Sequence, residues 1–114
     1  MRRLKFIIIE KLLEMLENKE RFKLVEVLAK EEYDRGHIPG AINIPLDDLE
    51  ALAKQKLKKT DTIVVYCASY TCHASTKAIR KLLELGYENT VDFKGGKRWW
   101  QHAGFELEKE LSAH

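Results

Sequence analysis

Apolar residues alternate along the chain between short runs and longer stretches with helical spacing. The short runs, at residues 6–9, 22–27, 41–44, 62–66 and 90–93, predict strands. Apolar positions three or four residues apart predict helices over residues 10–18, 46–57 and 73–85, with shorter helical segments at 30–34 and 97–102. Strands that alternate with helices are joined by right-handed crossovers. The pattern therefore predicts a three-layer α/β fold, with a mainly parallel central sheet and helices on both faces.

The run TIVVY, at residues 62–66, has no polar side, which favours a central strand covered on both faces. The helix expected after it directs one apolar stripe to the core, formed by Ala74, Ala78, Ile79, Leu82 and Leu83. No repeat, low-complexity tract or linker interrupts the pattern. We therefore expect one domain over residues 1–114, ordered from about residue 4 to about residue 110, with residues 112–114 frayed.

The composition narrows the classes of function that the chain can have. Its 45% hydrophobic fraction supports an ordinary core, and its net charge of +2 is too small to indicate nucleic-acid binding. The apolar run at residues 6–9 stops at Glu10, so it predicts neither a secretion signal nor a membrane span. Two cysteines do not make a disulfide scaffold in a domain of this size, which favours a reducing environment. We expect a cytoplasmic monomer.

Both cysteines lie in one stretch, YCASYTCHAS, at residues 66–75. Cys67 ends the expected central strand, and residues 68–73 carry the chain into the next helix. Ligands of such sheets bind where strands end, and a short loop curled over a cysteine can direct several N–H groups inward. Together with the helix dipole, these groups lower a thiol pKa to about 3.5–7.5 at comparable sites. We therefore expect a water-accessible thiolate at Cys67, although a buried structural cysteine would fit the same position.

Three segments resemble the signature segments of the rhodanese family, in that family's order. VEVLAKEEYDRGHIPGAINIP, at residues 25–45, resembles the first signature, most of all in GHIPGAINIP. TIVVYCASYTCHAS, at residues 62–75, falls where the family carries its active-site cysteine loop. GYENTVDFKGGKRWWQHAGFELE, at residues 86–108, is similar to the closing segment, with Gly-Gly and tryptophan before Ala-Gly.

The resemblance implies a rhodanese fold and a sulfurtransferase without a metal or organic cofactor. Cys67 would attack the outer sulfur of thiosulfate, polysulfide or a low-molecular-weight persulfide, become a persulfide, and pass the sulfur on. The acceptor would be a thiol, a cyanide-like nucleophile or a protein, and neither nucleic acid nor a membrane would be a partner. The donor would bind to the loop, at Ala68, Ser69, Tyr70, Thr71, Cys72 and His73. The loop would be supported by Glu26, Arg35 and His37.

The chain departs from the family's pattern at two places. Many thiosulfate-using members carry an arginine five positions after the cysteine, and phosphatase-like relatives carry one six positions after it. Here these positions hold Cys72 and His73, which cannot grip an oxyanion with two parallel bonds as a guanidinium does. Phosphatase chemistry is therefore not expected, and thiosulfate is a doubtful donor. The family's Asp-Val-Arg is altered to Glu26-Val27-Leu28, and we expect Glu26 to accept N–H bonds from the loop.

Several roles stay open at this stage. Cys72 either packs beneath the loop or acts as a resolving thiol that attacks persulfidated Cys67 and leaves a disulfide. A zinc site would need Cys67, Cys72, His73 and His37, whose spacing matches no usual ligand pair. We expect His37 to bond the backbone of the GHIPGA turn. One of the tryptophans at residues 99 and 100 is expected in the core, the other at the mouth of the site, with Tyr70 exposed at the loop tip.

Three functions are compatible with these residues. The first is a sulfurtransferase that works through a Cys67 persulfide. The second is a sulfur-carrier or binding module of the same fold with little activity alone. The third is a thiol–disulfide redox protein or sulfur sensor that uses both Cys67 and Cys72.

Overall fold

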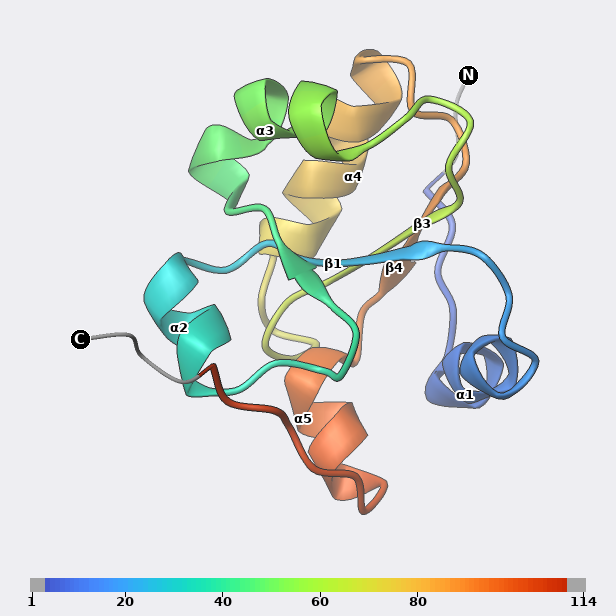
Figure 1. Cartoon of the computed structure of the whole chain (residues 1–114), viewed down its shortest axis with the longest axis vertical. Coiled ribbons are helices and arrows are strands. Elements are labelled where there is room, and N and C mark those ends of the chain that lie inside the picture. Colours follow the sequence, from blue (N-terminus) through green and yellow to red (C-terminus); the bar gives the residue numbers. More distant parts are fainter. Residues whose placement is uncertain (1–3, 111–114) are drawn as a thin grey trace.

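A four-stranded sheet organises the computed structural model, which describes residues 4–110 (Figure 1). The strands are β1 (Lys23–Glu26), β2 (Ile42–Asn43), β3 (Ile63–Tyr66) and β4 (Thr90–Phe93), in the spatial order β2-β1-β3-β4. Every pair of neighbouring strands is parallel. The predicted parallel sheet is thus confirmed, and β3, the strand expected at the centre, has neighbours on both sides.

Helices cover both faces of the sheet, as the alternating pattern predicted. Helices α3 (Leu49–Lys56) and α4 (Ala74–Glu84) lie on one face, and α1 (Ile9–Glu17) and α5 (Gly96–His102) on the other (Figure 1). The short helix α2 (Lys30–Arg35) follows the end of β1, and the 3-10 helix η1 (Leu46–Asp48) leads into α3. Among the described helices, none has the length and apolar character needed to cross a lipid bilayer.

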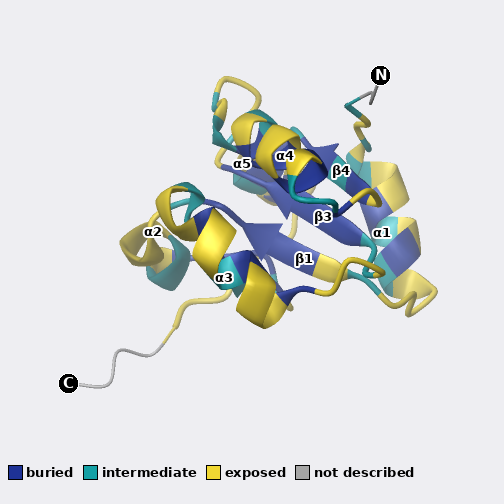
Figure 2. Cartoon of the chain, turned by 90° about the horizontal axis from the view of Figure 1, so that it is seen from above, coloured by how far each residue is buried: buried dark blue, intermediate teal, exposed yellow. Residues whose placement is uncertain are grey.

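The two faces of β3 bury alternate residues in two separate cores. Ile63 and Val65 pack with α3 and α4, whereas Val64 and Tyr66 pack with α1 and α5. This division follows from the two-residue period of a strand. All four side chains of β3 are buried, which accounts for its continuous apolar sequence and its dark-blue ribbon in Figure 2.

The register brings the carboxyl ends of three strands to one level. Glu26 of β1 is opposite Tyr66 of β3, which is opposite Phe93 of β4. The residues that follow these strands, including Cys67, therefore emerge along one edge of the sheet. Chemistry that needs side chains from several segments is assembled most simply at this edge.

Two predicted elements differ from the structure. The run at residues 6–9 forms only one isolated bridge, between Phe6 and Asp92, and α1 already begins at Ile9. Phe6 and Ile8 are exposed there, and Ile7 and Ile9 are only partly buried, so the run is an edge segment rather than a strand inside the sheet. The helix expected over residues 46–57 is divided into η1 and α3. The other elements begin and end within two residues of their predicted bounds.

Candidate active site

Cys67 directly follows β3 and is held from below by the start of α5. Its carbonyl oxygen accepts a hydrogen bond of 3.1 Å from the N–H of Lys97, and the carbonyl of Ala68 accepts one of 2.9 Å from Arg98. The close approach needs a glycine, because a Cβ on Gly96 would collide with the Cys67 carbonyl. Gly96 also has a φ of +61°, which side chains disfavour. The main chain at Cys67 and Ala68 is therefore fixed at two successive carbonyls.

The sulfur of Cys67 is bonded to that of Cys72 in a disulfide whose Cα atoms are 6.3 Å apart. Cys67 has no exposed surface, and Cys72 is half-buried. The expectation of a water-accessible thiolate is therefore wrong for this form, in which the sulfur is covalently paired and buried. The interpretation that Cys72 only packs beneath the loop is wrong here too. The bridge spans five residues, so it reshapes one loop and is no scaffold for the domain.

The loop between the two cysteines is a tight turn with an exposed tip. The N–H of Cys72 donates a 3.0 Å hydrogen bond to the carbonyl of Ser69, and the hydroxyls of Ser69 and Thr71 are 3.0 Å apart. Ala68, Tyr70, Thr71 and His73 are exposed, and donor binding to this loop stays a prediction. The amide of Cys72 is thus used inside the turn, and an inward cradle of N–H groups around Cys67 stays a prediction.

The far end of the loop is anchored from β4 by Lys94. Its ammonium group donates to the carbonyl of Cys72 at 2.9 Å and to the hydroxyl of Thr76 at 3.0 Å. Thr76 in turn donates to the Asp92 carboxylate at 3.2 Å. Asp92 is buried, and this burial raises the pKa of its carboxyl group, although Ser75, Thr76 and Lys94 act in the opposite direction. A polar chain therefore links the middle of β4 to the main chain of Cys72.

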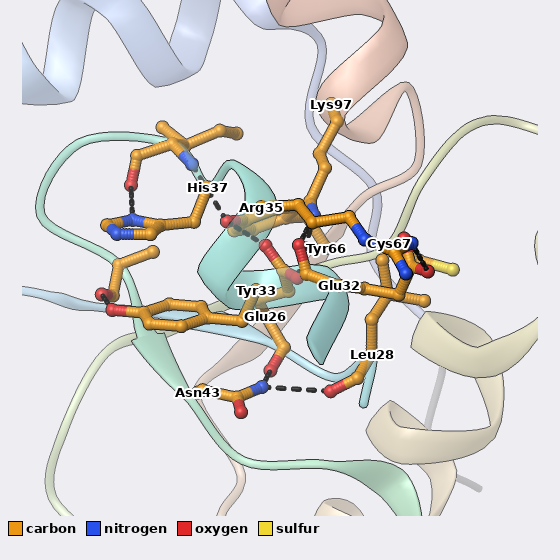
Figure 3. A network of polar contacts seen from close by, with 12 residues as sticks. Glu26, Leu28, Glu32, Tyr33, Arg35, His37, Asn43, Tyr66, Cys67 and Lys97 are labelled. Carbon is orange, nitrogen blue, oxygen red and sulfur yellow. Dashed lines mark hydrogen bonds and ion pairs between the residues drawn. The ribbon is translucent and has the colours of Figure 1, made fainter. Parts of the chain in front are cut away.

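A second polar network lies beside Cys67, around the fully buried Glu26 (Figure 3). The Tyr66 hydroxyl donates to Glu26 Oε1 at 2.7 Å, and Lys97 Nζ forms an ion pair with Oε2 at 2.9 Å. Tyr66 itself accepts a 3.0 Å bond from the N–H of Ile38, and Lys97 also donates to the carbonyl of Glu32. Glu26 thus joins β1, β3 and α5. The expected bonds from loop amides to Glu26 are replaced by these two side-chain partners.

Burial dominates the protonation of this network. It raises the pKa of Glu26 above the usual value of 4.5, while the nearby Lys97 ammonium and the Tyr66 hydroxyl limit the rise. Burial also raises the pKa of Tyr66, and the adjacent carboxylate adds to that effect. Tyr66 therefore stays a neutral hydroxyl that donates to Glu26 and accepts from the backbone.

The two other residues expected to support the loop have different partners. Arg35 donates to Glu32 at 2.7 Å on its own helix, with 73% of its side chain exposed, so its contact supports α2 rather than the loop. His37 Nδ1 lies 3.0 Å from the carbonyl oxygen of Ile38, and since this oxygen can only accept, the ring nitrogen is the donor. The His37 ring stacks on the Tyr33 ring, with centroids 4.0 Å apart. Its Nε2 lies 3.2 Å from Glu110. These contacts fit the expected structural role of His37 in the turn.

A pocket of about 430 Å³ adjoins the exposed side of the loop. Its walls are formed by Ser69, Tyr70, Thr71, Arg98, Trp99 and His102. Tyr70 meets Trp99 edge-on, with ring centroids 6.0 Å apart, and Trp99 meets His102 at 5.4 Å. Trp100, in contrast, is buried and donates to the carbonyl of Glu106. The tryptophans therefore divide as expected, one in the core and one at the mouth of the site.

Sequence reasoning assigned no role to Lys94, Gly96, Lys97 or the Tyr66 hydroxyl. Three of them flank or belong to the Gly-Gly of FKGGKRW, the segment that resembles the family's closing signature. That segment reaches the Cys67 loop because β4 is parallel to β3 and ends at the same level. Lys94 and Lys97, on either side of the two glycines, were the sequence feature that could have indicated a role for this segment at the site.

Comparison with known proteins agrees with this geometry. The family model of the rhodanese-like domain matches residues 9–103, and the chain belongs to that family. A relative in the yeast Ogataea parapolymorpha, the adenylyltransferase and sulfurtransferase uba4, is 40% identical over 68% of this chain and 19% of its own length. The thiosulfate sulfurtransferase PspE of Escherichia coli is 38% identical over 63% of this chain and 67% of its own. The putative sulfur carrier protein YrkF of Bacillus subtilis is 29% identical over 75% of this chain.

Solved structures show the same fold. The crystal structure of the BH2092 protein from Bacillus halodurans superimposes with a TM-score of 0.86 at 30% identity, covering 94% of this chain and 78% of that one. The solution structure of the rhodanese-like domain from the Anabaena Alr3790 protein gives 0.84 at 28% identity, covering 98% and 89%. The chain spans 19% and 44% of the lengths of the uba4 and YrkF relatives.

Proposed function

We propose that this chain is a sulfurtransferase that carries sulfane sulfur as a persulfide on Cys67. The observation that carries the proposal is the position of Cys67 in a rhodanese-family domain, at the end of the central strand and clamped by α5. Relatives named sulfurtransferase and sulfur carrier support the same chemistry. The reaction needs no metal or organic cofactor, because each step exchanges one sulfur–sulfur bond for another bond to sulfur.

The steps balance as follows. The Cys67 thiolate attacks the outer sulfur of a donor, whose sulfur–sulfur bond breaks, so that sulfite leaves from thiosulfate or a thiolate leaves from an organic persulfide. An acceptor such as cyanide or a thiol then attacks the outer sulfur of the persulfide. The new bond forms as the persulfide bond breaks, and the Cys67 thiolate is regenerated.

The disulfide form described above is the resting state in this proposal. A thiol reductant opens the Cys67–Cys72 bond before the first transfer, which suits a reducing, cytoplasmic environment. Reduction also allows the tip of the loop, at residues 69–71, to move and admit a donor to the buried sulfur. Preparations kept without a reductant are therefore expected to be inactive until the bond is opened.

The pocket beside the loop suggests which donors fit. It offers the Arg98 guanidinium for an anionic group and the Trp99 and Tyr70 rings for an apolar part. None of the residues 4–110 that line it is acidic. We infer that an organic persulfide that carries a carboxylate binds here better than thiosulfate, which has no apolar part. A protein that presents a persulfide or accepts one would dock over the same surface.

Mass spectrometry of the loaded protein tests the proposal. The protein is reduced, freed of reductant, and incubated separately with thiosulfate, polysulfide and cysteine persulfide. At the earliest time points we expect a mass gain of one sulfur atom that maps to Cys67, and cyanide added then should remove the sulfur, with thiocyanate as product. Cys72→Ser is the matched control and should still gain the sulfur. An equal gain in Cys67→Ser would refute the proposal.

The second candidate is a sulfur carrier with little turnover alone. The complete burial of Cys67 favours it, because a partner protein could be needed to open the loop. Loading and turnover separate the two functions. A carrier gains the sulfur from a donor but transfers it to cyanide far more slowly than it was loaded.

A further inference from the structure

We propose that Cys72 is a resolving thiol, which discharges the persulfide on Cys67 as hydrosulfide. The inference rests on the proposed function, since it needs the Cys67 persulfide as its substrate. It adds a second outcome to the chemistry of the site. Where no external acceptor arrives, the protein reduces sulfane sulfur to sulfide instead of transferring it.

The disulfide is the observation that carries this inference. The Cα atoms of Cys67 and Cys72 are 6.3 Å apart, within the span of about 4.4–6.8 Å that a disulfide bridges. The fold therefore accommodates the product of the resolving reaction with the loop in place. A thiol that can reach the Cys67 sulfur in the disulfide also lies beside that sulfur when it carries a persulfide.

Both ends of the loop are fixed by other elements, which keeps the two sulfurs together. At the Cys67 end, α5 holds two successive carbonyls through the N–H groups of Lys97 and Arg98. At the Cys72 end, Lys94 holds the carbonyl of Cys72 from the end of β4, and Thr76 connects Lys94 to the buried Asp92. The attack is thus intramolecular between anchored groups, for which effective concentrations far exceed those of external thiols.

The chemistry balances without an oxidant. The Cys72 thiolate attacks the inner sulfur of the persulfide, that is, Sγ of Cys67. The Cys67–Cys72 bond forms, the bond to the outer sulfur breaks, and hydrosulfide leaves with the electron pair. Two equivalents of an external thiol then reduce the disulfide and are themselves joined in a disulfide. The sum converts one persulfide and two thiols into one thiol, hydrogen sulfide and one disulfide.

The burial of the two sulfurs sets the direction of the final reduction. Cys67 has no exposed surface, whereas Cys72 is half-buried. An external thiol therefore reaches Cys72 first, forms a mixed disulfide there and expels Cys67 as the thiolate. The nucleophile is released in its reactive form, and the second external thiol restores Cys72.

The test uses donors that cannot release sulfide by themselves. Thiosulfate and benzenethiosulfonate lose sulfite and sulfinate, so that any sulfide must come from the protein. The reduced protein is mixed with each donor, alkylated at intervals, and analysed by mass spectrometry while sulfide is measured. We expect the wild type to release about one sulfide per chain while the Cys67–Cys72 bond forms, and Cys72→Ser to hold a persulfide at least about tenfold longer.

The outcomes separate the inference from the proposed function. If Cys72→Ser gains a sulfur but the wild type keeps its persulfide equally long, the resolving role is overturned and the transferase stands. If Cys72→Ser never gains a sulfur from any donor, both fail. Cys72→Ala repeats the comparison without a hydroxyl.

Lys94→Met tests the anchoring of the loop, with Lys77→Met, exposed on α4, as the matched control. In Lys94→Met the rate of sulfide release should fall about tenfold relative to the rate of persulfide formation in the same variant, because Cys72 is no longer held. Sulfide release at the wild-type rate would show that the anchored geometry has no part in the step.

Discussion

The contact between Gly96 and the Cys67 carbonyl can be tested by one added methyl group. In Gly96→Ala the new Cβ would collide with the carbonyl oxygen and carbonyl carbon of Cys67 and with the carbonyl carbon of Ala68. These are backbone atoms, which cannot rotate away. The φ of +61° adds a second cost, because this region is disfavoured for residues with a Cβ.

The two costs can be estimated separately. A left-handed backbone costs a residue with a side chain about 1–2 kcal/mol. Forcing packed groups apart costs about 1–3 kcal/mol more. We therefore expect Gly96→Ala to lower the free energy of unfolding by about 3 kcal/mol, and to displace the clamp of α5 on Cys67. The displaced sulfur should gain its persulfide about tenfold more slowly.

Gly104→Ala is a matched control that isolates the backbone cost. Gly104 also has a positive φ, of +98°, but a Cβ built there meets nothing within 4 Å. It should lose only about 1 kcal/mol and keep the wild-type rate of persulfide formation. Urea-induced unfolding, followed by tryptophan fluorescence, gives the two stabilities on reduced protein. Equal losses in the two variants would show that the close approach of Gly96 to Cys67 makes no contribution to stability.

Three further predictions concern the polar network and the pocket. Lys97→Met leaves the buried Glu26 carboxylate without its cation and should cost about 3 kcal/mol near pH 7, while the double variant with Glu26→Gln should recover part of the loss, as measured by urea unfolding. Because burial raises the pKa of Glu26, the contribution of its protonated form to stability is present below pH 4.5 and is lost as the pH rises. The loss of unfolding free energy in Lys97→Met should therefore become smaller as the pH falls. A loss that does not change with pH would contradict the pairing of Lys97 with Glu26. Tyr66→Phe removes a buried hydroxyl that is bonded to Ile38 and Glu26, and should lower the free energy of unfolding by about 2 kcal/mol. An unchanged free energy of unfolding would show that these two bonds do not stabilise the fold. Trp99→Ala should raise the concentration of cysteine persulfide needed for half-maximal loading about fivefold without a change for thiosulfate, whereas Gln101→Ala, outside the pocket, should change neither.

The sequence predicted the structure correctly where a single short segment determines the secondary structure. The β-branched run before Cys67 predicted a central strand, and the structure confirms a strand buried on both faces. The placement of Cys67 at its end followed directly. The exposed run at residues 6–9 shows the limit of this reasoning, because four apolar residues look alike whether they lie inside a sheet or along its edge.

Contacts between distant segments were not predictable in the same way. Glu26, at the end of β1, is paired with Lys97 of α5, which comes within 2.9 Å only because α5 packs under the loop. No local pattern records such a pair. The disulfide depends likewise on how the loop curls, since a spacing of five residues fits both a bonded and an unbonded pair.

The hydrogen bonds between α5 and the loop separate the position of the Cys67 main chain from the choice of molecules that dock at the loop tip. The root of the loop, at Cys67 and Ala68, is hydrogen-bonded to the helix, while the tip around Tyr70 points into solvent. Substitutions at the tip can therefore change which molecules dock without shifting the main chain that carries the sulfur. Residues at the tip could be varied in a library while the root is kept constant, so that a change in the molecules that bind would not come from a displaced Cys67.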